Sequence, residues 1–295
     1  MNKIFLAVSL FWFLVSCSAY QQGNDHPDSN TRTSEYPRET VVMTATNISA
    51  ETPIYALTPT FVPTLTPRPT LSSQDAQVAV LKLISNNGGC NLPCWWGLTP
   101  GKTTWQEARN FLEILSPQII SLRDNVYGLT YKNLPKDISG GVIGATISTS
   151  NDVIQTISTD IYYPLAEIMQ KNGKPTEIWI FADKETINPE IPFTLALFYA
   201  DQGILAIYQG TSLREESPEI CPNRIGGDQV SWFLWNPSLA FSFADAGRNA
   251  LLFQNTPSER PFLQINDVTN MDISMFYDKY IHPENGTSCF EMLNK

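Results

Sequence analysis

Cysteines are the residues of this 295-residue sequence best suited to chemistry, and four lie beyond residue 72: Cys90, Cys94, Cys221 and Cys289. An even number of cysteines is typical of disulfides in a protein outside the reducing cytoplasm, and four cysteines allow three pairings. We favour Cys90 with Cys94, because Pro93 bends the chain between them, and Cys221 with Cys289. The alternative is a zinc site, which usually combines two closely spaced cysteine pairs. Cys221 and Cys289 form no such pair, so no metal site is predicted.

A phosphate-binding loop would explain Gly101-Lys102-Thr103, but the surrounding spacing excludes it. The loop needs a glycine five residues before Gly101, and that position is Trp96. Without this glycine the backbone amides cannot wrap around a phosphate. The sequence therefore predicts no nucleotide site and no other cofactor.

The sequence offers few histidines and acidic residues that are suited to catalysing hydrolysis. Of the two histidines, His26 lies in a low-complexity segment and His282 lies at a predicted helix end, where an imidazole suits the helix dipole. Glu215, Glu216 and Glu219 form an acidic run typical of a solvated loop, although a glycosidase carboxylate pair is recognisable only in the fold. We assign no catalytic residue and keep an extracellular hydrolase as the alternative hypothesis.

The adjacent tryptophans Trp95 and Trp96 directly follow Cys94. Neighbouring side chains on a loop held by a disulfide diverge, so one ring can pack inside while the other contacts a sugar or a protein. The competing interpretation is two core tryptophans. Trp95 and Trp96 are therefore candidate partner-binding residues, and Trp232 and Trp235 present the same choice.

The amino terminus contains a fifth cysteine, Cys17, in a segment with the features of an export signal. Lys3 supplies a positive charge, and residues 4–15 are uncharged and too few to span a membrane as a helix. Leu14-Val15-Ser16-Cys17 resembles the bacterial lipobox. The resemblance implies removal of residues 1–16, attachment of fatty-acyl chains to Cys17 and a lasting hold on a membrane. The alternative is an ordinary secretory peptide cut elsewhere.

Composition divides the rest of the chain. Residues 18–72 are rich in Thr, Ser and Pro. Proline removes backbone donors and keeps the preceding residue out of the helical region, so we expect a disordered, extended stalk after the lipidated Cys17. Residues 73–295 are expected to form the globular domain.

Charge restricts the partners. The chain has 19 basic and 29 acidic residues, a net charge of −10. Such a surface repels phosphate backbones and anionic headgroups, so nucleic acid is excluded as a partner. Attachment to the membrane would therefore depend on the lipid anchor.

Periodicity predicts four helices: residues 74–85 with Ser73 as the N-cap, a helix opened by the capping box Thr104–Glu107 and stopped by Pro117, residues 164–172 with Pro164 at the first helical position, and residues 270–281. Strands are expected at 142–149, 153–161, 177–181, 193–200 and 204–209.

Both faces of the hairpin at 193–209 are apolar, which predicts a central position covered on both sides. The fold class is therefore α+β: antiparallel sheet packed with about four helices. The element order allows a duplicated helix–strand unit with a boundary near residue 162.

Two local motifs resemble known lipoprotein families. Leu92–Thr103 (Leu-Pro-Cys-Trp-Trp-Gly-Leu-Thr-Pro-Gly-Lys-Thr) resembles a motif of uncharacterised bacterial surface lipoproteins. The Pro-Gly-x-Thr turn at Pro100–Thr103 and the Gly-x-Pro at Gly173–Pro175 are similar to repeats of the SmpA/BamE outer-membrane assembly lipoproteins and of β-lactamase-inhibitor-like domains. The resemblance implies fold and location, and no catalytic residue.

These features together predict an exported lipoprotein, anchored by Cys17 at the cell surface or facing the periplasm. Its domain is expected to bind an envelope protein or glycan without catalysis. A solute-binding protein is less favoured, because that fold normally needs two larger α/β lobes.

Overall fold

The computed structural model describes residues 70–136, 138–160, 163–182, 190–213, 219–222, 230–252, 261–282 and 289–293, all within one compact unit, Thr64–Lys295. Cys17, the predicted signal peptide and nearly all of the predicted stalk lie outside the described residues, as do Glu215 and Glu216. Among the described residues, no helix combines the length and apolar character needed to cross a membrane.

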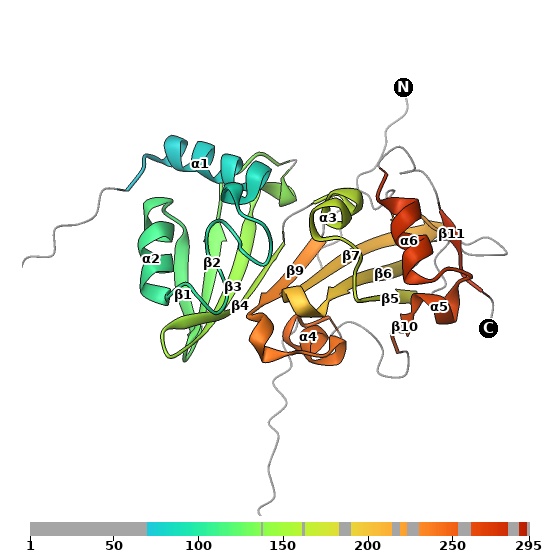
Figure 1. Ribbon diagram of the computed structural model, residues 1–295. Coiled ribbons are helices and arrows are strands. Elements are labelled where there is room, and N and C mark those ends of the chain that lie inside the picture. Colours follow the sequence, from blue (N-terminus) through green and yellow to red (C-terminus); the bar gives the residue numbers. More distant parts are fainter. Residues whose placement is uncertain are drawn as a thin grey trace, which may run out of the picture. The chain divides into compact units, whose positions relative to one another are not determined.

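A nine-stranded antiparallel sheet is the centre of the fold, in the order β1-β2-β3-β4-β9-β7-β6-β5-β10 (Figure 1). Its strands are β1 (Gln118–Arg123), β2 (Val126–Tyr131), β3 (Ile143–Ser150), β4 (Val153–Asp160), β5 (Glu177–Ala182), β6 (Glu190–Tyr199), β7 (Ile204–Leu213), β9 (Val230–Trp235) and β10 (Leu263–Gln264). A second sheet pairs β8 (Glu219–Ile220) with β11 (Phe290–Glu291). The predicted α+β class is confirmed.

The four predicted helices are α1 (Ser73–Asn86), α2 (Trp105–Ile114), α3 (Leu165–Asn172) and α6 (Ile273–Tyr280). The capping box of α2 is confirmed, with Thr104 and Glu107 bonding each other's backbone. Two boundary predictions were wrong by one residue, since Ser72 caps α1 and Pro164 is the N-cap of α3. Two further helices, α4 (Phe243–Asn249) and α5 (Ile265–Val268), were not predicted.

The hairpin formed by β6 and β7 lies in the interior of the sheet, as its two apolar faces predict. Leu195 and Leu197 belong to one hydrophobic core, together with residues of α1, α2, α3 and α6. Ala196 and Phe198 point to a second core that includes Phe243 of α4. Because side chains alternate along a strand, the hairpin is covered on both faces.

The element order repeats within the sheet. Helix α2 is followed by β1, β2, β3 and β4, and helix α3 is followed by β5, β6, β7 and β9. Figure 1 shows β4 and β9 side by side, and these two strands join the halves by pairing from Thr156 with Trp235 to Asp160 with Ser231.

Candidate functional site

The cysteine pairing has the predicted form. Cys90 bonds Cys94 within a short loop, and Cys221 bonds Cys289 across 68 positions of sequence. Disulfides persist in oxidising compartments, so the two bonds indicate a location outside the cytoplasm.

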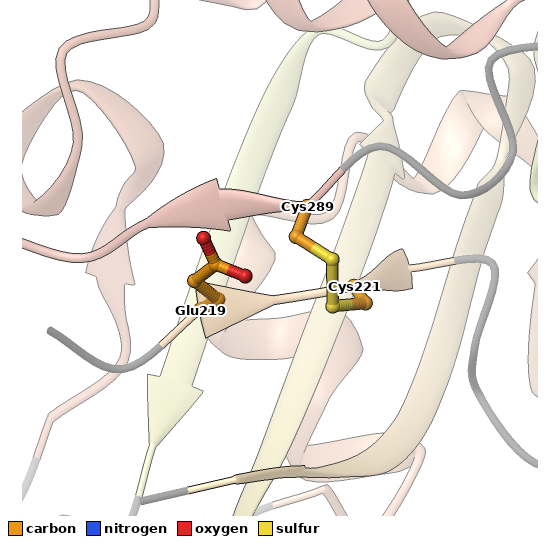
Figure 2. A group of neighbouring side chains, drawn as sticks. All are labelled: Glu219, Cys221 and Cys289. Carbon is orange, nitrogen blue, oxygen red and sulfur yellow. A yellow bond between two sulfur atoms is a disulfide. The ribbon is translucent and has the colours of Figure 1, made fainter. Parts of the chain in front are cut away.

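A group of potential metal ligands is formed by Glu219, Cys221 and Cys289, whose ligand atoms lie within 4.8 Å of one another. Figure 2 shows the Cys221–Cys289 disulfide beside the carboxylate of Glu219. A metal-binding cysteine contributes a thiolate, and neither sulfur is a thiolate while the two are bonded. The group is therefore a disulfide with an exposed neighbouring acid.

Trp95 and Trp96 lie inside the domain, with only 1% and 2% of their surfaces exposed. Their rings stack with centroids 4.2 Å apart, and Trp96 also meets the ring of Tyr131 edge-on at 5.5 Å. The expectation that one of these rings is presented to a partner is therefore wrong in this structure, and the core interpretation holds. Trp232 and Trp235 are buried in the same way.

Asn87 explains why the tryptophan loop turns inward, and sequence reasoning missed it. This buried side chain donates from Nδ2 to the carbonyls of Cys90 (2.9 Å) and Cys94 (2.7 Å), and its Oδ1 accepts from the backbone N–H of Trp96 (3.1 Å). Three hydrogen bonds thus fix the loop beneath the end of α1. The signal available beforehand was Asn86-Asn87-Gly88-Gly89, a helix-ending sequence in which Asn87 is left-handed.

We expect Asn87→Asp to lower the free energy of unfolding by about 2 kcal/mol at neutral pH, because it leaves the partly buried carbonyls of Cys90 and Cys94 without their donor. The facing carbonyls raise the pKa of the introduced carboxyl in the folded state above its unfolded value. The cost is therefore greatest at neutral pH and shrinks as the pH falls through that raised pKa, where the protonated acid donates again. Urea unfolding at several pH values measures this dependence. Asn91→Asp, at an exposed position of the same loop, is the control and should change stability little.

No family model, curated protein or solved structure matched this chain.

The Gly101-Lys102-Thr103 turn lies just before α2 in the chain and is hydrogen-bonded to β4. The backbone N–H of Gly101 donates to the carbonyl of Ile154 at 2.7 Å, and the Thr103 hydroxyl accepts from the N–H of Thr99 at 2.9 Å. These hydrogen bonds hold the turn together and against the sheet. The acid and histidine considered for hydrolysis lie in different elements, with Glu219 on β8 and His282 just after α6.

One part of the sheet surface remains open to solvent. Every position of β9 except the partly exposed Ser231 is buried, whereas β3 alternates between buried and partly exposed residues. The side chains of β1 to β4 on the α4 side of the sheet are mostly hydroxyl-bearing or aliphatic, with the exposed Gln118 and Asp160 at the start of β1 and the end of β4. We call the part of this surface between them the open half-face: Ile120, Leu122, Thr130, Thr146, Ser148, Thr156 and Ser158. The open half-face lies on the same side as the second core, because Ser158 pairs with Phe233.

Proposed function

We propose that this chain is a lipoprotein of the bacterial cell envelope, held to a membrane through Cys17, whose domain acts by binding a partner. The Leu14–Cys17 sequence after an uncharged segment supports the anchor. The two disulfides support export, since such bonds form outside the reducing cytoplasm. A lipid anchor with a long stalk confines the domain near the membrane and raises its effective concentration for partners there.

The observation that carries the binding proposal is the open half-face. Its pairs Thr146–Ser158 and Ser148–Thr156 place four hydroxyls on neighbouring strands, and the hydroxyls of the second pair are hydrogen-bonded to each other. Ile120 and Leu122, which are 46% and 53% exposed, border these pairs. Hydroxyls that both donate and accept, next to exposed aliphatic groups, suit a protein surface or a glycan. The acidic character of the chain disfavours a polyanionic partner.

Arginine substitutions test the surface. Thr146→Arg and Ser158→Arg should weaken retention of purified envelope protein or glycan at least about tenfold, because a bulky charge blocks contact at the centre of the surface. The melting temperature should change little, since both side chains are partly exposed. Ser85→Arg, at an exposed position of α1, is the matched control. Unchanged binding by both variants would place the interaction elsewhere.

His282→Ala and Glu219→Ala test the alternative, an extracellular hydrolase. Both variants should leave partner binding unchanged, and loss of a measured phenotype in these two variants would favour the hydrolase instead.

The anchor has its own test. Mass spectrometry of the mature protein should find fatty-acyl groups on an amino-terminal Cys17, and Cys17→Ser should move the protein from the membrane fraction to the soluble fraction. An unmodified amino terminus in soluble wild-type protein would contradict the lipid anchor. It would not affect the proposal of partner binding, which the arginine variants test independently.

A further inference from the structure

Strand β1 (Gln118–Arg123) forms one end of the nine-stranded sheet and, among the described residues, pairs with β2 alone. All of its residues are exposed except the partly buried Ile119, and Ile120 and Leu122 are large apolar side chains in solvent. The outer edge of such a strand presents a row of backbone N–H and C=O groups and is a template for a further strand.

The hydrogen bonds of the neighbouring strands show which backbone groups of β1 point outward. Residues of antiparallel strands alternate between pairs that share hydrogen bonds and pairs that share none. The Thr149 N–H donates to the Asn125 carbonyl at 2.9 Å in the register of β2 and β3. Three positions along, Gly128 and Thr146 therefore share none, and the backbone of Gly128 bonds its other partner, Ile120. Since Ile120 bonds inward to β2, its two neighbours in β1 direct their N–H and C=O groups to the outer edge.

The chain before Leu71 reaches the structure beside this edge. The Leu71 N–H donates to the carbonyl of Ile114, the last residue of α2, at 3.1 Å. Ile114 lies four residues before Gln118, and Pro67 lies four residues before Leu71. Both stretches span at most about 14 Å, so Pro67 can lie opposite Gln118 with the preceding residues running antiparallel to β1.

The sequence of this preceding segment suits an edge strand. Residues 64–70 read Thr-Leu-Thr-Pro-Arg-Pro-Thr, with Thr or Arg at every even position and Leu or Pro at every odd position. An alternation of period two is typical of a strand. Proline lacks a backbone N–H, and an edge strand accepts it only where that N–H would have faced solvent. Because both prolines are at odd positions, the even positions are the ones able to bond a neighbouring strand.

We propose that residues 64–67, at the domain end of the predicted stalk, pair with the outer edge of β1 as a tenth antiparallel strand. Thr66 lies opposite Ile119 and Thr64 lies opposite Ser121, and each of these two pairs shares hydrogen bonds. Two independent alternations agree in this register, since the outward-directed groups of β1 meet the threonines and the proline position meets none of them.

The same register brings apolar side chains together. Leu65 lies opposite Ile120, and aliphatic side chains paired across neighbouring strands stabilise a sheet. Leu65 then extends the open half-face beyond β1, and the free part of the stalk is shorter by residues 64–69. The pairing needs no bound partner, so it does not depend on the proposed function and either can fail alone.

Amide hydrogen exchange, followed by NMR in the purified full chain carrying Cys17→Ser to prevent lipidation, tests the pairing. Thr66→Pro removes the N–H that donates to the Ile119 carbonyl. It should therefore speed exchange of the Ile119 and Ser121 amides at least about tenfold, because an unpaired edge amide is open to solvent. The Ile120 amide, which bonds β2, should exchange at the same rate in both proteins and is the internal control.

Leu65→Pro is the matched control one residue away. Its proline falls on an odd position, where the N–H faces solvent, so exchange at Ile119 and Ser121 should stay within about threefold of the parent chain. Equal effects of Thr66→Pro and Leu65→Pro would overturn the proposed register, whether both speed exchange or neither does. Protection of the two edge amides that survives Thr66→Pro but falls on dilution would also overturn the proposal, because it would identify a second copy of the chain as the occupant of the edge.

Discussion

Gly203→Ala is expected to lower the free energy of unfolding by about 4 kcal/mol. Gly203 ends the turn between β6 and β7 in a left-handed conformation, with φ 70° and ψ 43°. A Cβ at this position would lie 2.2 Å from the carbonyl oxygen of Trp235, a backbone atom that cannot rotate away. The Gly203 carbonyl also accepts from the Trp235 N–H at 2.9 Å, so relief of the clash would disturb the contact between this turn and the end of β9.

The matched control for this substitution is Gly140→Ala. Gly140 has nearly the same φ, 67°, but nothing lies within 4 Å of the position a Cβ would take. The only cost of alanine at this position is therefore its left-handed backbone conformation, which should lower the free energy of unfolding by about 1 kcal/mol. Urea unfolding of both variants measures the difference, and equal losses would show that the contact with Trp235 is absent in solution.

Replacement of Cys221 and Cys289 together by serine is expected to cost about 4 kcal/mol. This disulfide closes a loop of 68 positions, and cross-linking so long a loop removes much conformational entropy from the unfolded chain. It also joins the two short strands of the second sheet, where Phe290 pairs with Ile220 and both side chains are buried. Unfolding of the oxidised double variant in urea measures the loss.

The other disulfide supplies the comparison. Cys90 and Cys94 are four positions apart, so their joint replacement by serine should cost about 2 kcal/mol on the same entropic argument. A loss that is as large for the short loop as for the long one would contradict the dependence on loop length and would indicate that packing around the Cys90–Cys94 loop dominates.

Local signals were sufficient for many of the elements. Thr104 and Glu107 satisfy each other's backbone donors, so the start of α2 follows from four consecutive residues. Asn151 and Asp152 both adopt positive φ between β3 and β4, in agreement with the predicted turn. The cysteine pairing also followed from spacing, because five adjacent positions can close on themselves.

Other elements lacked a local signal. Strand β9 is apolar at nearly every position, and a short apolar run has no period that separates strand from buried helix. Edge strand β1 has exposed residues on both faces, so the alternation typical of a half-buried strand is missing. The start of α4 did carry a capping box, Ser242 with Asp245, which sequence reasoning overlooked.

Sequence by itself determined the α+β class, the presence of four helices, the start of α2, the central hairpin and the cysteine pairs, because each depends on neighbours in the chain or on alternation along one segment. Tertiary structure alone decided the burial of Trp95 and Trp96 and the hydrogen bonds from Asn87 to their loop. These features depend on which distant segments meet, and the free energy of burying a side chain depends on all the atoms around it. The open half-face likewise exists because α4 packs against β9, β7 and β6 while the matching surface of β1 to β4 has no described helix over it.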